Sequence, residues 1–145
     1  MATMPPNPAL EALDVLLGEW TAEVPQFGDA RGRVTIDRLE GGAFLRIRSQ
    51  PPPPAPTATQ LVGLDDSSGL YTVLYYDSRG VSRVYRMSFD GGVWKMWREA
   101  PGFDQRFTGT LSADGRGIQA AWEKSLDNET WEHDFDIIYT KRADG

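Results

Sequence analysis

The chain begins with apolar residues at helical spacing and continues with a long region in which apolar and polar residues alternate. Leu10, Leu13 and Leu17 recur every three to four residues, as on one face of a helix. Pro8 suits the first helical position, where its missing N–H costs nothing, and Gly18 is a natural stop. This pattern predicts a short N-terminal helix from Pro8 to Leu17.

From Glu19 onward the apolar period is two, which is the period of a β-strand. Turn signals such as Asp77-Ser78-Arg79-Gly80 and Asp90-Gly91-Gly92 recur about every ten residues, with Gly supplying positive φ and Asp bonding its own backbone. The segments between them are rich in β-branched and aromatic residues, which favour strands. We expect strands at 19–24, 32–38, 43–49, 59–65, 70–77, 81–89, 92–98, 103–111, 116–124 and 131–141.

Short links between successive strands predict antiparallel neighbours, and closing such a meander into a barrel removes its exposed edges. We therefore expect an all-β fold: a single antiparallel up-and-down barrel of about ten strands, similar to lipocalins and fatty-acid-binding proteins. A two-sheet sandwich is the rival architecture, but it needs longer crossovers than most of these links.

A chain of 145 residues suits one domain, so we expect residues 1–145 to form a single barrel domain. We expect residues 1–7 to be flexible. The stretch 50–58 holds five prolines, cannot be a central strand, and is expected to form a stiff loop. A loop at the mouth of a cavity and a recognition site for a Pro-binding partner are the alternatives.

Composition excludes several functions. The net charge of -6 and the pI of about 4.7 argue against a nucleic-acid partner. Absence of cysteine excludes disulfides, thiolate zinc sites and a cysteine nucleophile. The first eight residues show no signal-peptide pattern, and no apolar run approaches the length of a membrane span. We therefore expect a cytoplasmic protein without membrane contact.

The alternating faces mix aromatic with polar side chains, which is typical of a ligand cavity. Arg83, Gln105 and His133 stand among aromatic residues, and buried polar atoms need partners. A small hydrophobic or amphipathic molecule inside the barrel would meet this need; mutual pairing of these groups is the alternative. The candidate ligand-binding residues are Trp20, Tyr75, Arg83, Tyr85, Met87, Trp97, Gln105, Phe107, Trp122 and His133.

His133 is the only histidine, which excludes multi-histidine metal sites. It could be structural, a general base, or a single axial ligand to haem. A base needs an orienting carboxylate, and alternation places Asp134 and Asp136 on the opposite face of its strand. Phosphate-binding glycine loops and the nucleophile elbow are absent from the sequence. We expect no cofactor, with haem as the alternative.

Several blocks of sequence, in order, resemble an uncharacterised bacterial family with a lipocalin-like (calycin) barrel. They extend over most of the stretch from Leu10 to Arg142. The family implies the barrel fold and no particular activity. The blocks are Leu16-Leu17-Gly18-Glu19-Trp20-Thr21, Asp77-Ser78-Arg79-Gly80, Trp94-Lys95-Met96-Trp97-Arg98, Arg106-Phe107-Thr108-Gly109, Trp122-Glu123-Lys124-Ser125 and Trp131-Glu132-His133-Asp134-Phe135.

The chain is more distantly similar to nitrobindins, which are haem-binding barrels. The resemblance includes Gly18-Glu19-Trp20 near the first strand and implies His133 as the axial ligand on a late strand. Glu132, Asp134 and Asp136 depart from the ending of nitrobindins, which is more apolar and basic.

Four classes of function therefore stay open. Small-molecule binding inside the barrel leads, and a haem protein follows. An enzyme acting within the barrel would show titratable groups with shifted pKa values, but we favour a protein that is not an enzyme. A structural module would show a solid core and an outer apolar patch. A homodimer through the outer face of the sheet is a further expectation.

Overall fold

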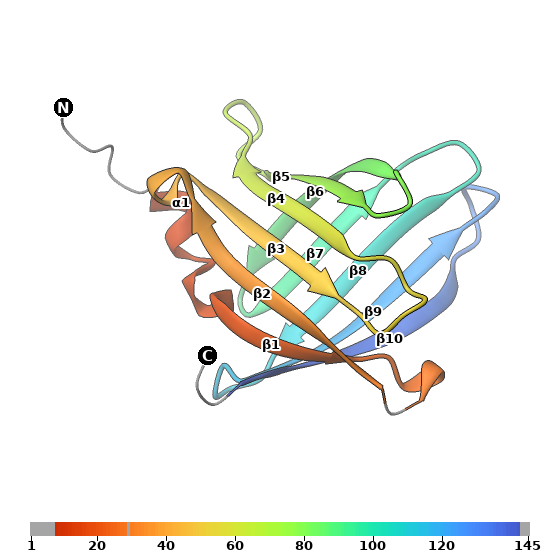
Figure 1. Ribbon diagram of the computed structural model, residues 1–145. Helices are drawn as coiled ribbons and strands as arrows, with labels where there is room; N and C mark the ends of the chain where they lie inside the picture. The colour runs from red at the N-terminus through yellow and green to blue at the C-terminus, as the bar shows by residue number, and fades with distance from the viewer. Residues whose placement is uncertain (1–7, 29, 143–145) are drawn as a thin grey trace.

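The computed structural model describes residues 8–28 and 30–142, and these form a closed antiparallel barrel (Figure 1). Residues 1–7, for which we expected flexibility, lie outside the described residues. The strands are β1 (Gly18–Glu23), β2 (Arg31–Leu39), β3 (Phe44–Gln50), β4 (Ala58–Leu64), β5 (Tyr71–Asp77), β6 (Ser82–Asp90), β7 (Val93–Arg98), β8 (Asp104–Leu111), β9 (Gly117–Ser125) and β10 (Glu132–Lys141).

Each strand pairs with the next along the chain, and β1 closes the barrel against β10, with Trp20 opposite Lys141 and Glu23 opposite Ile138. The predicted all-β barrel is confirmed, and every predicted strand boundary lies within one residue of the observed one. The closure leaves no open edge among these strands, so the sandwich alternative is wrong.

The predicted helix from Pro8 to Leu17 is too long. The chain forms a short helix α1 (Pro8–Glu11) and a 3₁₀ turn η1 (Asp14–Leu16). The amides of Leu13 and Leu16 donate to the carbonyls of Leu10 and Leu13, at 3.0 and 2.9 Å. Such i to i+3 bonds align every third side chain, so Leu16 rather than Leu17 completes the buried face.

This N-terminal segment closes one end of the barrel. Leu10, Leu13 and Leu16 are at most 1% exposed and belong to the core cluster. Trp20 at the start of β1 donates its indole N–H to the Leu16 carbonyl at 2.9 Å, which joins the 3₁₀ turn to the barrel.

Aromatic side chains fill the adjoining interior of the barrel. The rings of Trp94 and Phe107 lie edge to face with centroids 4.7 Å apart, and Phe107 lies 5.1 Å from Trp122. Edge-to-face geometry is favourable because the positive edge of one ring meets the negative face of the other. Met87 and Phe107 are almost fully buried here, so this half of the barrel is solid.

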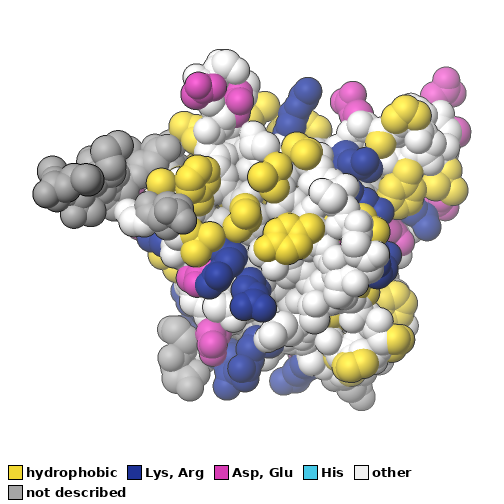
Figure 2. Space-filling model, turned by 45° about the horizontal axis from the view of Figure 1, so that its top comes forward, with side chains coloured by type: hydrophobic (Ala, Val, Ile, Leu, Met, Phe, Trp, Pro, Cys, Tyr) yellow, Lys and Arg dark blue, Asp and Glu magenta, His cyan; other side chains and the backbone are white. Residues whose placement is uncertain are grey.

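The outer surface carries exposed apolar side chains among basic ones, as Figure 2 shows for one face. Leu74 on β5 and Val84 on β6 are directly opposed across the two strands, and each is about half exposed. No helix in the described part of the chain has the length and hydrophobicity that a membrane crossing requires.

Candidate functional site

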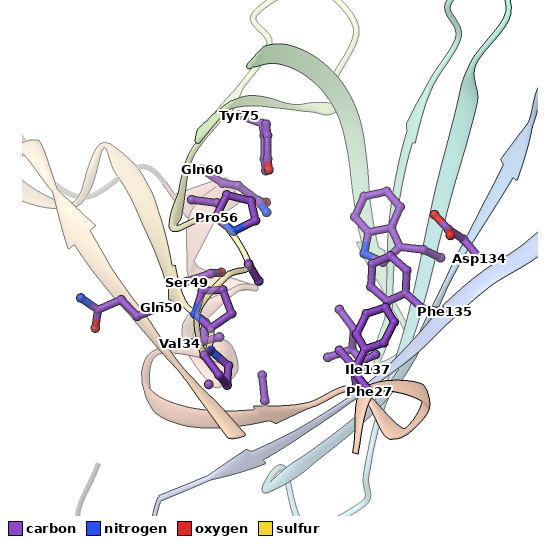
Figure 3. Close-up of a pocket in the computed structure, with 18 of the residues that line it drawn as sticks. Phe27, Val34, Ser49, Gln50, Pro56, Gln60, Tyr75, Asp134, Phe135 and Ile137 are labelled. Carbon is purple, nitrogen blue, oxygen red and sulfur yellow. The ribbon is translucent and has the colours of Figure 1, made fainter. Parts of the chain in front are cut away.

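The end of the barrel away from α1 is hollow and holds a cavity of about 850 Å³ (Figure 3). Inward-facing residues of most strands line it. The turn η2 (Pro25–Phe27) and the proline-rich connection between β3 and β4 lie at its mouth. Gln50 and Ala58, the ends of the predicted loop, belong to the strands, and prolines 51–54 and 56 between them line the cavity. The expected loop therefore lies where the mouth-of-cavity alternative placed it.

One wall of the cavity is apolar. Phe135 and Ile137 from β10 face Val34 across the hollow, and Phe27 of η2 lies beside Phe135 with ring centroids 6.4 Å apart (Figure 3). Tyr139, farther along β10, is desolvated, and burial raises the pKa of its phenol well above the usual value. This wall can remove the apolar body of a ligand from water.

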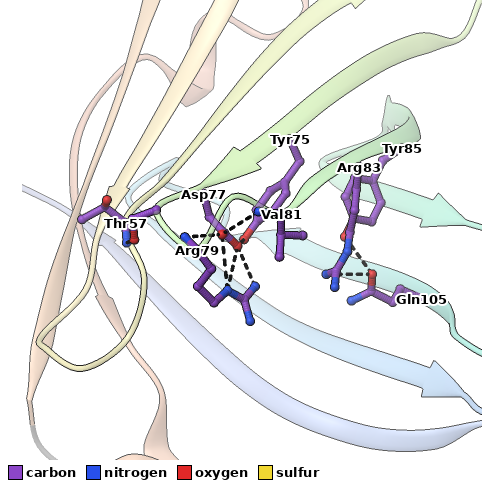
Figure 4. Close-up of polar contacts among 9 residues, drawn as sticks. Thr57, Tyr75, Asp77, Arg79, Val81, Arg83, Tyr85 and Gln105 are labelled. Carbon is purple, nitrogen blue, oxygen red and sulfur yellow. Dashed lines mark hydrogen bonds and ion pairs between the residues drawn. The ribbon is translucent and has the colours of Figure 1, made fainter.

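A polar group stands on the side of the cavity formed by β6 and β8 (Figure 4). The Tyr85 hydroxyl donates to Oε1 of Gln105 at 2.8 Å, and the Arg83 guanidinium approaches the same oxygen at 3.4 Å. Burial raises the pKa of Tyr85, and the positive charges of Arg83 and Arg98 oppose that rise. Arg83 also lies 5.6 Å from the centre of the Phe103 ring.

A second polar group surrounds Asp77, whose side chain has no exposed surface. Tyr75 donates to Oδ2 of Asp77 at 2.7 Å, and Arg79 adds an ion pair at 2.6 Å and a backbone N–H to Oδ1 at 2.9 Å (Figure 4). The Arg79 hydrogen bond holds the pKa of Asp77 well below its ordinary value. Burial, then the bond to Asp77, raises the pKa of Tyr75 to about 12. The partners of this carboxylate are therefore supplied by the protein.

Gln60 on β4 brings an amide to the cavity wall near Tyr75 (Figure 3). Its Oε1 is buried and has no hydrogen-bond partner among the residues that the structure describes. A buried acceptor without a partner costs roughly 1–3 kcal/mol, so a donor supplied by a bound molecule would be favourable here.

The structure brings five of the ten candidate residues into the cavity lining: Tyr75, Arg83, Tyr85, Gln105 and Trp122. Three others, Trp20, Met87 and Phe107, lie in the solid core. The sequence pattern cannot separate these groups, because core and cavity residues lie on the same inward faces at different depths.

Trp97 lies outside the cavity lining, on the outer face of β7. Its neighbour Met96 is buried and lines the cavity, and successive side chains of a strand point to opposite faces. Trp97 therefore points outward, and Met96 lines the cavity from β7 in its place.

His133 also lies outside the lining, because β10 contains a bulge. His133 is opposite Glu123 and Phe135 is opposite Trp122, so three residues of β10 match two of β9. The extra residue breaks the alternation that would have put His133 on the face of Phe135. His133 Nε2 lies 2.8 Å from Oδ1 of Asp136, and the imidazole is half exposed.

Other lining residues are absent from the sequence-based set. Phe135 and Ile137 alternate with Asp134 and Asp136 along the sequence, and this period of two is the signal that could have selected them. Gln60 carried no signal, since an amide in a strand is ordinary until its depth is known. Within residues 8–28 and 30–142 no three His, Cys, Asp or Glu side chains cluster as metal ligands would.

Comparison with known proteins supports the fold. No family model and no curated protein matches the chain. Among solved structures, the chain is similar to the crystal structure of Rv2717c from M. tuberculosis, with a TM-score of 0.59 and 16% sequence identity. The match covers 94% of this chain and 99% of that one. At this identity the likeness shows the shared barrel, and a shared fold does not establish a shared activity.

Proposed function

We propose that this protein binds a small hydrophobic or amphipathic molecule in the hollow end of the barrel. The observation that supports this most directly is the cavity of about 850 Å³, whose wall holds the unpartnered Oε1 of Gln60. Ligand sites of proteins occupy about 300–1,000 Å³ and combine apolar walls with few polar groups.

The apolar and polar residues of the cavity would contribute differently to binding. Apolar contact with Phe135, Ile137 and Trp122 supplies affinity, since removing apolar surface from water contributes about 25 cal/mol per Å². Gln60 and Gln105 supply orientation, because each presents an amide to the hollow.

We propose binding without turnover. The buried carboxylate of Asp77 is held by Arg79 and Tyr75, and Asp134 at the mouth lies 3.7 Å from Lys124. Asp77 is a poor general base, because its hydrogen bond with Arg79 holds the pKa of its carboxylate well below the ordinary value. An enzyme acting within the barrel is therefore the less favoured alternative.

The haem alternative needs an imidazole directed into the cavity. His133 lies on the outer side of the β10 bulge, and its Nε2 atom, the usual axial donor, is engaged with Asp136. The described residues therefore do not fit an axial haem site at this position.

We further propose membership of the lipocalin-like bacterial family that the sequence resembles. The closed ten-stranded barrel and the structural likeness to a bacterial protein support it. A cytoplasmic location, the absence of nucleic-acid and membrane partners, and a homodimer through the outer sheet face stay as predictions of the sequence.

Two measurements test the binding proposal. Native mass spectrometry of the freshly purified protein reports a retained small molecule and the subunit count together. Titration with uncharged N-phenyl-1-naphthylamine, followed by its fluorescence, reports an apolar site directly.

A matched pair of variants tests whether the probe binds in the cavity. Ser49→Trp puts an indole into the cavity from β3, whereas Arg48→Trp adds the same ring to the outer face of that strand. We expect the affinity for the probe to fall at least tenfold in Ser49→Trp and to stay unchanged in Arg48→Trp. Equal binding by both variants would exclude the cavity as the site.

A further inference from the structure

We infer that the molecule bound in the cavity carries an oxyanion, a carboxylate or sulfonate on an apolar body, and that Arg83 receives it. This inference rests on the proposed binding function and specifies its ligand class.

Arg83 lacks an anionic partner among the described residues. Its guanidinium has five N–H donors, yet the groups it meets are neutral: the Oε1 atom of Gln105, 3.4 Å from Nη1, and the hydroxyl of Tyr85. Among the described residues no carboxylate forms an ion pair with it, whereas Arg79, which also lines the cavity, is paired with Asp77. Arg83 is half-buried, so the missing partner is only partly replaced by water.

Basic side chains surround this position. Arg98 on β7 and Lys124 on β9 are the residues directly opposite Gln105 on its two neighbouring strands. Directly opposed residues share a face of the sheet, so Arg83, Arg98 and Lys124 surround one neutral amide. The acids near them are Asp134, 3.7 Å from Lys124, and Glu99, which lines a second hollow with Arg83 and Arg98 and forms no ion pair with either among the described residues. This local excess of positive charge stands in a chain of net charge -6.

Gln105 is oriented to assist. Gln105 lines the cavity, and because its Oε1 accepts from Tyr85 and Arg83, its Nε2 group keeps hydrogens to donate to a ligand. Arg83 and Gln105 together thus present several N–H donors to one point, as binding of a carboxylate or sulfonate requires.

The geometry also places the two ends of such a ligand. Arg83 and Gln105 come from β6 and β8, while the apolar wall of Phe135 and Ile137 comes from β10. An amphipathic anion can therefore lay its body on β10 and its head group on β6 and β8.

A pair of probes that differ mainly by one anionic group tests this. The anion 1-anilinonaphthalene-8-sulfonate shares its ring system with the uncharged N-phenyl-1-naphthylamine. We expect wild type to bind the sulfonate about tenfold more tightly than the neutral probe, as a charge-assisted hydrogen bond implies. Competition between the probes, and loss of both in Ser49→Trp, would show that they share the cavity.

Arg83→Gln is the decisive variant, and Arg86→Gln is its control. Both residues lie on β6 and lose the same charge, but Arg86 is exposed on the outer face. We expect Arg83→Gln to lose about tenfold in sulfonate affinity with the neutral probe changed less than twofold. Arg86→Gln should change neither, and Arg83→Lys should retain part of the preference.

The outcomes separate the two proposals. Equal affinity of wild type for both probes, or a sulfonate preference that survives Arg83→Gln, overturns the oxyanion inference and leaves the binding function standing. Failure of wild type to bind either probe overturns the binding function, and the inference with it. If Arg83→Gln does not fold, the comparison of Arg83→Lys with wild type, at low and high salt, decides in the same way.

Discussion

The Tyr85 hydroxyl donates to Oε1 of Gln105 at 2.8 Å, although the two residues are 20 positions apart. The bond joins β6 to β8 across the inside of the barrel, past the intervening strand β7. It holds the side chain of Gln105 in place, beside the guanidinium of Arg83.

We predict that Tyr85→Phe lowers the free energy of unfolding by about 1 kcal/mol, the usual value of one hydrogen bond. The ring contacts with Tyr75 and Trp122 remain, so the change isolates the hydroxyl. Urea denaturation of the single variants Tyr85→Phe and Gln105→Met and of the double variant gives the coupling energy. Strictly additive losses would show that the bond contributes nothing.

Gly32 on β2 faces the proline-rich connection at the mouth of the cavity. A Cβ at this position would lie 2.9 Å from the Cα of Pro51 and 3.1 Å from the carbonyl oxygen of Gln50. Because both are backbone atoms, the connection must move, and we expect Gly32→Ala to destabilise the protein by about 1–3 kcal/mol. Affinity for the neutral probe should also change.

Gly117 on β9 provides the control, because a Cβ there meets only ordinary contacts, with Ser112 Oγ at 3.5 Å. Gly117→Ala should be neutral or slightly stabilising, since it reduces the freedom of the unfolded chain. Equal melting temperatures for both variants would contradict the crowding at Gly32.

Phe107 lies at the centre of the solid half of the barrel with 1% of its surface exposed. Phe107→Ala should lower the free energy of unfolding by about 3–5 kcal/mol, because it removes buried apolar surface and leaves a cavity. Val84→Ala on the outer face, where Val84 is 55% exposed, should cost less than about 0.5 kcal/mol. Denaturant titration of both variants checks the contrast, and a small loss in Phe107→Ala would contradict the packed core.

Acid should destabilise this protein through its hydrogen-bonded carboxylates. The Arg79 hydrogen bond holds the pKa of Asp77 far below normal, and bonds from Ser68 and Ser67 lower the pKa of Asp65 from 3.8 to about 2. Because these groups bind protons first in the unfolded chain, the stability they provide is present above about pH 4 and is lost as the pH falls toward 2.

Replacing Asp77 by Asn removes one of these groups. The variant should be less stable than wild type at neutral pH, and its free energy of unfolding should vary less between about pH 4 and 2. Urea titrations of both proteins across that range provide the measurement. Identical pH dependence would show that Asp77 is not among the groups that link acid to unfolding.

Much of the candidate site could be anticipated from alternation. The inward positions of Tyr75, Tyr85 and Gln105 follow from the period of two, and all three line the cavity. Alternation could not tell depth, so Met87 and Phe107 were placed with them although they lie in the core. It also failed where the period breaks, at the β10 bulge beside His133.

The sequence by itself determined the number of strands, their bounds and their antiparallel order. These properties are local, because they depend on alternating side chains, on Gly and Asp at tight turns, and on links too short for crossovers. Tertiary structure decided which end of the barrel is solid and which is hollow. Leu10, Leu13 and Leu16 close one end, while β10 and the prolines after Gln50 surround a space that no side chain fills. That outcome depends on how all ten strands meet in three dimensions, and no segment carries it alone.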